Sequence, residues 1–283
     1  MRADNQMKGS KNRIKPDLGV SETIGYIILF GITITGIGLV TLYGYPALVN
    51  AQADANIRNM ERNMIVLQSD VNSLVYKSVP YKETTMQVSG GVISVDPIIS
   101  NFMIKDGADN PLITYPDLTK QGTGAIQFIS DTGEISIALQ NGAVVKHQSG
   151  GSVMLSKPRW FIDTNPSSME ETFVITLIQV DTSGSTLATS GISTVQMEIQ
   201  PLLISDPTPA APGSGDETNI VETPQAPQEV KITIPLIDSK YRKALENYFE
   251  LDLGMITSDG ITWTKSGIHR VIIKGWKINV INL

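Results

Sequence analysis

The sequence predicts an α+β protein. A long N-terminal transmembrane and amphipathic helix should precede a mainly antiparallel, sandwich-like β ectodomain with one C-terminal helix. Three observations predict this fold. Residues 23–49 carry no charge, and apolar residues recur every three or four positions between residues 60 and 75. Short apolar runs bounded by turn residues fill most of residues 84–203. Each pattern has the period of the element that it predicts.

The transmembrane helix is expected over residues 20–49. Its uncharged core, Thr23–Val49, is 27 residues long, whereas a helix needs about 20 apolar residues to cross a bilayer core of roughly 30 Å. Glycines are tolerated where membrane helices pack, and Pro46 lies near the outer end, where a kink does least harm. A cleaved signal peptide is the alternative, because Ala51-Gln52-Ala53 fits the small-x-small pattern of a cleavage site. The apolar run is longer than an ordinary signal peptide uses, which favours a retained anchor.

The charges that flank this segment predict its orientation. Before it stand five basic residues, Arg2, Lys8, Lys11, Arg13 and Lys15, whereas the charges after it are mixed. Basic residues stay on the cytoplasmic side of a membrane. We therefore expect a single-pass protein of the cell membrane, with residues 1–19 as a basic cytoplasmic leader and the C-terminal domain outside the cell.

Residues 50–80 are expected to form an amphipathic stalk, helical from about residue 50 to 78, because Pro80 stops the helix. Its apolar positions follow a helical period: Met60, Met64, Leu67, Val71, Leu74 and Val75. This stripe must be covered, either by the protein's own sheet or by the helix of a neighbouring subunit. The sequence leaves both coverings open.

Residues 81–283 are expected to form one β-rich ectodomain. Short strands are predicted at residues 86–95, 124–130, 133–139, 143–147 and 152–155, and two longer ones at 171–180 and 193–204. Asp131-Thr132-Gly133 and Gln140-Asn141-Gly142 are hairpin signals, since Gly and Asn tolerate positive φ. Such evenly spaced strands favour an antiparallel sandwich or a strongly curled sheet.

The last part of the chain begins with residues 205–229, which are rich in proline and acidic residues and are expected to form a flexible loop. A strand at 229–235, a helix at 239–251 and three short strands ending at Leu283 should follow. Ser239 can cap the helix, and Gly254 follows its end. This tail is too short to be a stable separate domain, so we assign it to the same ectodomain.

The composition excludes most catalytic chemistry. The net charge of −6 disfavours nucleic-acid binding, and the chain has no cysteine and only two histidines. No nucleotide-binding or hydrolase motif occurs, so we expect a protein that is not an enzyme and that needs no cofactor or metal. His147 and His269 are interpreted as surface or structural residues. Trp160, Trp263 and Trp276 are interpreted as core or sheet-face residues. Residues 106–110 are interpreted as a solvated turn rather than a calcium loop, because the ligand spacing is wrong.

The start of the chain resembles a known family. Lys15-Pro-Asp-Leu-Gly-Val-Ser-Glu-Thr-Ile-Gly25 is similar to the class III signal peptides of archaeal type IV pilins and archaellins. The resemblance implies that a prepilin peptidase cuts between Gly19 and Val20. Glu22, the third residue after that cut, would then make an assembly contact. The segments Gly150–Pro158 and Tyr248–Glu250 resemble archaeal membrane-anchored proteins with the same start, which implies the architecture and no activity.

Two functions follow as hypotheses. The first is a pilin-like structural subunit of the cell surface, whose membrane helices bundle with those of other pilin-like subunits in a filament or an assembly platform. The second is a single-pass tethered protein whose β domain binds an extracellular ligand or polymer without assembling. The partners expected are the lipid bilayer, a prepilin peptidase and other subunits, including copies of the same chain as a homo-oligomer. An ecto-enzyme is a third hypothesis, and it ranks last because no catalytic motif supports it.

Overall fold

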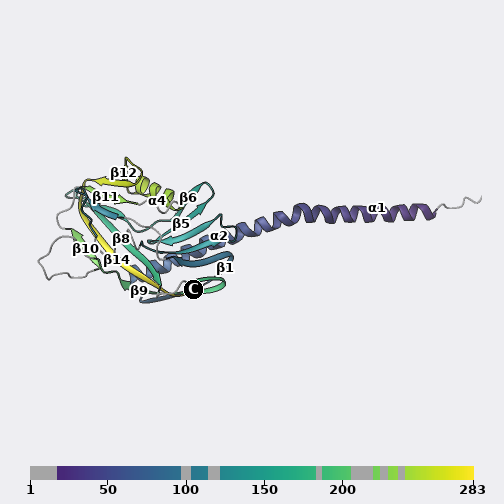
Figure 1. The fold of residues 1–283 in the computed structure, drawn as a ribbon, viewed down its shortest axis with the longest axis horizontal. Coiled ribbons are helices and arrows are strands. Elements are labelled where there is room, and N and C mark those ends of the chain that lie inside the picture. Colours follow the sequence, from purple (N-terminus) through teal and green to yellow (C-terminus); the bar gives the residue numbers. More distant parts are fainter. Residues whose placement is uncertain are drawn as a thin grey trace, which may run out of the picture. The chain divides into compact units, whose positions relative to one another are not determined.

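The computed structural model describes residues 18–96, 103–113, 122–182, 187–204, 219–223, 229–234 and 240–283 (Figure 1). The chain divides into two units, Met1–Asp54 and Ala55–Leu283. The long apolar N-terminal helix expected from the sequence is present. It consists of α1 (Leu18–Leu39), a wider π-turn η1 (Val40–Gly44) and α2 (Tyr45–Lys77), which continues into the second unit.

The π-turn η1 lies directly before Pro46. A proline has no N–H to donate, and its ring collides with the carbonyl four residues earlier, here that of Leu42. The chain responds by widening one turn, so that the amide of Tyr45 donates to the carbonyl of Val40. The sequence predicted a local disturbance at Pro46, and the π-turn is the form that it takes.

Residues 55–77 of α2 form the core of the second unit together with a ten-stranded sheet. All six apolar residues predicted to form the stripe of this helix are buried. They pack against strand residues such as Ile93, Phe128 and Ile278. The protein's own sheet therefore covers the stripe, which is one of the two alternatives that the sequence left open.

The main sheet has the strand order β6-β5-β4-β3-β1-β9-β14-β8-β7, with β10 also paired to β14. The bounds are β1 Tyr81–Asp96, β3 Ala125–Ser130, β4 Ser136–Gln140, β5 Ala143–Gln148, β6 Gly151–Ser156, β7 Phe161–Thr164, β8 Glu171–Thr182, β9 Ala188–Pro201, β10 Ile220–Thr223 and β14 Ile268–Asn282. Pairing is antiparallel except between β14 and β8, which are parallel over most of their length. The mostly antiparallel sheet was predicted, and the parallel pair of β14 and β8, next to the edge strand β7, was not.

The order of the strands requires this sheet to curl. Its two edge strands, β6 and β7, follow one another in the chain and are connected only by residues 157–160. Such a connection spans at most about 18 Å, whereas nine flat strands would place the edges about 38 Å apart. The sheet therefore bends until its edges approach each other, and α2 fills the inner side. Gln68 of α2 reaches this connection, because its Nε2 donates to the carbonyl of Lys157 at 3.2 Å.

A second, four-stranded sheet covers part of the opposite face. Its order is β12-β13-β11-β2, with bounds β2 Met103–Asp106, β11 Glu229–Thr233, β12 Ile256–Thr257 and β13 Thr262–Ser266. Strand β8 contributes to both cores. Phe173, Ile175 and Leu177 pack toward the second sheet, whereas Ile178 and Val180 pack toward α2. A strand buried on both faces reads as a continuous apolar run rather than an alternating one.

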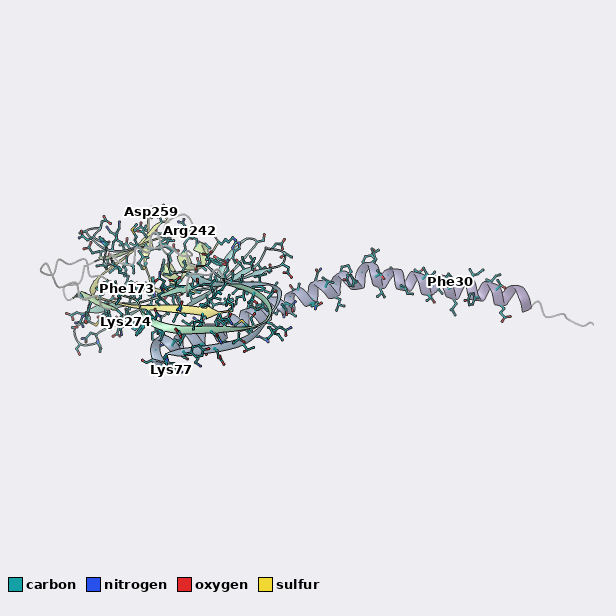
Figure 2. All side chains as sticks on the ribbon, turned by 60° about the horizontal axis from the view of Figure 1, so that its bottom comes forward. Phe30, Lys77, Phe173, Arg242, Asp259 and Lys274 are labelled. Carbon is teal, nitrogen blue, oxygen red and sulfur yellow. The ribbon has the colours of Figure 1, made fainter. Side chains whose placement is uncertain are left out.

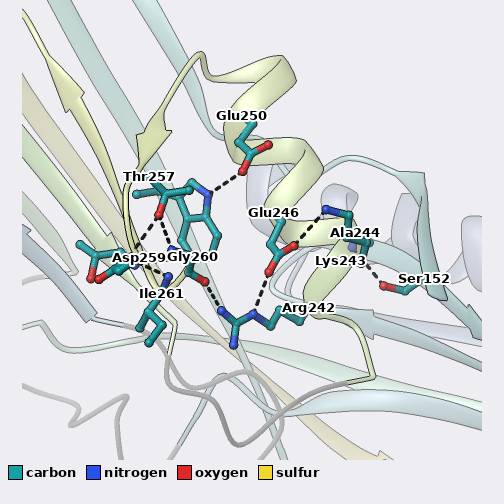
Figure 3. Close-up of polar contacts among 12 residues, drawn as sticks. Ser152, Arg242, Lys243, Ala244, Glu246, Glu250, Thr257, Asp259, Gly260 and Ile261 are labelled. Carbon is teal, nitrogen blue, oxygen red and sulfur yellow. Dashed lines mark hydrogen bonds and ion pairs between the residues drawn. The ribbon is translucent and has the colours of Figure 1, made fainter.

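The C-terminal helix α4 (Arg242–Asn247) continues into a π-turn, η2 (Tyr248–Asp252), and joins the two sheets. Arg242 pairs with Glu246 at 2.8 Å and donates to the carbonyl of Gly260 in the turn between β12 and β13 (Figure 3). Toward the main sheet, the amide of Ala244 donates to Ser152 Oγ of β6 at 3.0 Å. The expected apolar face of this helix is packed, with Tyr241, Tyr248 and Phe249 buried and Leu245 partly buried.

Two expectations for the C-terminal part need correction. Residues 205–229 are not one loop, because Ile220–Thr223 pair with β14 and Val221 is buried. Residues 205–218 and 224–228 lie outside the described residues, as does Ser239, the expected helix cap. Tyr241 precedes the helix and makes no side-chain capping bond. Finally, only two short strands follow the helix, and the third is the 15-residue β14.

Candidate membrane anchor

The uncharged helical segment exposes its apolar side chains along its whole length. Every residue from Glu22 to Val49 is exposed, including Ile27 at 63%, Phe30 at 56% and Leu42 at 66%. Figure 2 shows the side chain of Phe30 projecting from the bare helix. Soluble proteins rarely expose a continuous apolar surface of this size. The segment therefore requires an apolar environment.

The dimensions of this segment suit a membrane. Its 27 uncharged residues extend about 40 Å as a helix, more than the roughly 30 Å of a bilayer core. The helix that contains it, Glu22–Lys77, is the one helix in the described part of the chain that is long and apolar enough to cross a membrane. The hydroxyls of Thr33 and Thr41 donate to the carbonyls of Leu29 and Ile37 at 2.8 and 2.9 Å. Both polar groups are thus satisfied within the helix.

The residues at the predicted cleavage site lie at the start of this helix. Gly19 and Val20 belong to the helical backbone of α1, and their side chains lie outside the described residues, as does the basic leader to Asp17. Glu22 is exposed one turn further on.

The two histidines have structural surroundings. His147 Nδ1 lies 3.0 Å from the carbonyl of Lys240, and its ring meets Tyr241 edge-on at 6.4 Å, so it holds the start of α4 against β5. His269 Nδ1 accepts a hydrogen bond from the amide of Glu171 at 3.4 Å where β14 begins beside β8. Neither belongs to a cluster of three or more metal-ligating side chains in the described ranges. Their structural interpretation agrees with these contacts.

The turn at residues 106–110 uses its carboxylates internally. Asp106 accepts hydrogen bonds from the amides of Ala108 and Asn110 at 2.9 and 2.8 Å, and from Asn110 Nδ2 at 2.9 Å. Asp109 pairs with Lys231 at 3.2 Å. Partial burial works to raise the pKa of Asp106, but the hydrogen bonds from Asn110 and Ala108, with the charge of Lys231, lower it below its usual value. The carboxylates thus cap and brace a turn.

The tryptophans are core residues, as expected. Trp160 and Trp263 are buried on either side of Phe249, with ring centroids 5.9 and 5.6 Å from it, and Trp276 is partly buried against the α2 core. Burial, followed by the charge of Asp252, raises the pKa of the neighbouring Tyr248, whose hydroxyl donates to the carbonyl of Trp160 at 2.8 Å. This aromatic cluster packs η2 onto the second sheet, which is a structural role.

No curated protein and no solved structure matches the chain. A family model does match the chain, from Gly19 to Lys274 in β14. Gly19 is the residue before the predicted cleavage site. The matched region thus includes the apolar helix and most of the β-rich unit, and it covers far more than half of the chain. The chain therefore belongs to the family described as a family of unknown function (DUF7289), whose model matches residues 19–274.

Proposed function

We propose that the protein is a pilin-like, membrane-anchored structural protein of the cell surface, a subunit of a filament or of an assembly platform. The observation that carries the proposal is the exposure of every side chain from Glu22 to Val49. An apolar helix of this length is stable in a lipid bilayer, or in a bundle of equivalent helices once it has left the bilayer. The β-rich unit, with its two sheets taken as a sandwich-like pair, would form the outer surface.

Cleavage after Gly19 would act as the switch between these two environments. The five basic residues of the leader hold the uncleaved chain at an anionic cytoplasmic surface by about 1 kcal/mol each. After a prepilin peptidase removes residues 1–19, the helix starts with the amine of Val20 and the carboxylate of Glu22. A carboxylate is costly to bury in hydrocarbon without a cation. The amine of a neighbouring subunit supplies that cation, which favours assembly after cleavage.

A single-pass tether without assembly is the second candidate, and the burial of α2 favours it. A subunit that bundles through its stalk needs an exposed apolar stripe, but Met60, Leu67, Leu74 and the rest of the stripe pack inside the protein's own sheet. Only the part of the helix before Asp54 then remains for bundling. In this case the β domain binds an extracellular ligand or polymer and the basic leader stays attached.

The mass of the N-terminus in native membranes distinguishes the two candidates. The subunit proposal expects a chain that starts at Val20, and it expects Gly19→Leu to prevent both processing and assembly. Gly9→Leu, the same change within the leader, is the matched control and should be processed normally. A native chain that starts at Met1, with unchanged mass and oligomeric state in Gly19→Leu, refutes the subunit proposal and favours the tether. Recovery of the full chain in the soluble fraction without detergent refutes both.

A further inference from the structure

The outward side of α2 in the second unit carries two exposed arginines, and the carboxylate nearest to them outside this unit is Asp54, four residues before Arg58. We define the basic face as Arg58, Arg62, Ile65 and Val66, which lie three or four residues apart and therefore share one side of the helix. All four are exposed, Ile65 at 40% and Val66 at 52%. In the described part of the chain neither arginine forms an ion pair. The acidic neighbours Glu61 and Asp70 instead pair with strand residues, at 2.8 Å with Lys146 and 3.3 Å with Lys82.

A surface of opposite charge lies on the hairpin of β7 and β8. We define the acidic hairpin as Phe161, Asp163, Met169 and Glu170, all of them exposed. Phe161 is 49% and Met169 is 71% exposed, which is unusual for large apolar side chains. Among the described residues no lysine or arginine pairs with Asp163 or Glu170, so this surface also keeps its charge.

The acidic hairpin is ordered rather than loose. Its turn is closed by the amide of Asn165, which donates to the carbonyl of Glu170 at 2.9 Å, and by that of Met169, which donates to the carbonyl of Asn165 at 2.8 Å. Met169 has a φ of 58°, an uncommon conformation for a residue other than glycine. The turn therefore holds the apolar side chain of Met169 in water, in a backbone conformation that costs free energy. Burial of this side chain against a partner surface would offset that cost.

We propose that the acidic hairpin of one copy docks on the basic face of the next copy. The inference rests on the proposed structural function and names the contact between subunits. Each surface offers two exposed apolar side chains flanked by two like charges, and the charges of the two surfaces are opposite. Strand β7 is also one of the two edge strands of the main sheet, and natural proteins protect such edges by covering them, for instance with a helix. The helix α2 of a neighbouring copy would cover this edge.

This contact joins two different surfaces, so it is heterologous. A heterologous contact leaves one free surface of each kind at the two ends of any open array, and repetition of the contact extends the array. A two-fold contact of α2 with α2 would instead bring four arginines together and stop at a dimer. The opposite charges also make the docking weaken as salt is added, because exposed ion pairs are screened.

Single cysteines test this arrangement directly, since the natural chain has none. Full-length Val66→Cys and Met169→Cys chains, produced together and oxidised in native membranes, should form a disulfide-linked pair that contains one chain of each kind. Ile192→Cys, in an exposed apolar residue of β9, is the matched control and should not link to Val66→Cys. Linkage of Val66→Cys chains to one another, or no linkage of the mixed pair in processed and assembled protein, overturns the inference but leaves the proposed function standing.

Charge reversal gives a second readout. Arg58→Glu with Arg62→Glu should lower the yield of the mixed disulfide at least about tenfold, and Asp163→Lys with Glu170→Lys should do the same. The two double reversals combined should restore most of the yield, which a merely structural defect would not. Asp131→Lys with Glu134→Lys, on the exposed hairpin of β3 and β4, is the control and should leave the yield unchanged. Absence of processing and of any assembly in the natural chain refutes the proposed function, and the inference with it.

Discussion

Replacing Gln68 of α2 by leucine should destabilise the β-rich unit although leucine is apolar and of similar size. Gln68 is 4% exposed and sits among the apolar residues of the helix stripe. Its Nε2 donates to the carbonyls of Gly142 at 2.6 Å and of Lys157 at 3.2 Å. These carbonyls belong to the β4–β5 turn and to the connection between the two edge strands. One amide thus fixes the helix to two places where the sheet curls.

The magnitude follows from the two carbonyls that lose their donor. Each carbonyl left without a donor costs about 1–3 kcal/mol, which already includes the lost hydrogen bond, so the two together cost about 2–6 kcal/mol. Burial of the leucine offsets roughly 1.5–3 kcal/mol of this. We expect a net loss of about 2 kcal/mol, or a lowering of Tm by about 4–8 °C for a unit of this size.

Thermal unfolding of the full chain in detergent, followed by tryptophan fluorescence, measures this change. The buried Trp160 and Trp263 report on the second unit. Asn59→Leu, an exposed amide of the same helix, is the matched control and should change Tm by less than about 2 °C. If Gln68→Leu matches the natural chain in Tm, the amide is not needed to hold the helix in the sheet, and the reasoning fails.

Other consequences can be tested on the same unit. In a denaturant titration, Gly124→Ala should lower the free energy of unfolding by more than about 3 kcal/mol, because φ is +62° and a Cβ would lie 2.0 Å from the carbonyl oxygen of Val180. Gly133→Ala, at φ +72° with open space around it, should lower it by about 1 kcal/mol. Partial burial works to raise the pKa of Glu246, but Arg242 and Lys243 lower it, so its stabilisation is present above about pH 4.5 and lost as the pH falls below that value. Glu246→Gln should therefore lose less Tm on acidification than the natural chain, and an equal loss would contradict this. A protease site placed between Ile204 and Asn219 should yield two fragments that stay together in gel filtration, since β14 lies between β8 and β9; fragments that separate would show that this pairing does not hold the unit together.

The parts of the fold that depend on local periodicity could be predicted from the sequence. The stripe of α2 was identified in full because each of its residues repeats at helical spacing, and a helical face needs no knowledge of what covers it. The hairpins at residues 131–133 and 140–142 were found for a similar reason, since Asn141, Gly133 and Gly142 adopt the positive φ that such turns require. What covered the stripe was a long-range property, so the sequence left it open.

Strand β14 was predicted only as the last of three short strands, although it is 15 residues long. Within it, Gly275 serves packing rather than a turn. In the structure a Cβ at this position would lie 2.6 Å from Ile204 Cδ1 and 2.9 Å from the carbonyl of Leu202. The glycine lets the chain after β9 cross close to the strand. Strand β10 was missed because its four residues stand between prolines and acidic residues and gain their order from pairing with β14.

The candidate anchor was predicted from the uncharged run of residues alone. The basic face and the acidic hairpin were not predicted, because a charged side chain indicates a binding surface only when its ion-pair partners are known. In the sequence, Arg58 and Arg62 belong to the mixed charges that follow the apolar segment, together with Asp54 and Glu61. The structure turns the carboxylates of Glu61 and Asp70 toward Lys146 and Lys82, and neither arginine forms an ion pair in the described part of the chain. Strand β7 is an edge strand of the main sheet, and Asp163 and Glu170 of its hairpin with β8 are exposed. Once the stripe is buried, the outward side of α2 is the only side of the helix in this unit that a second copy can reach.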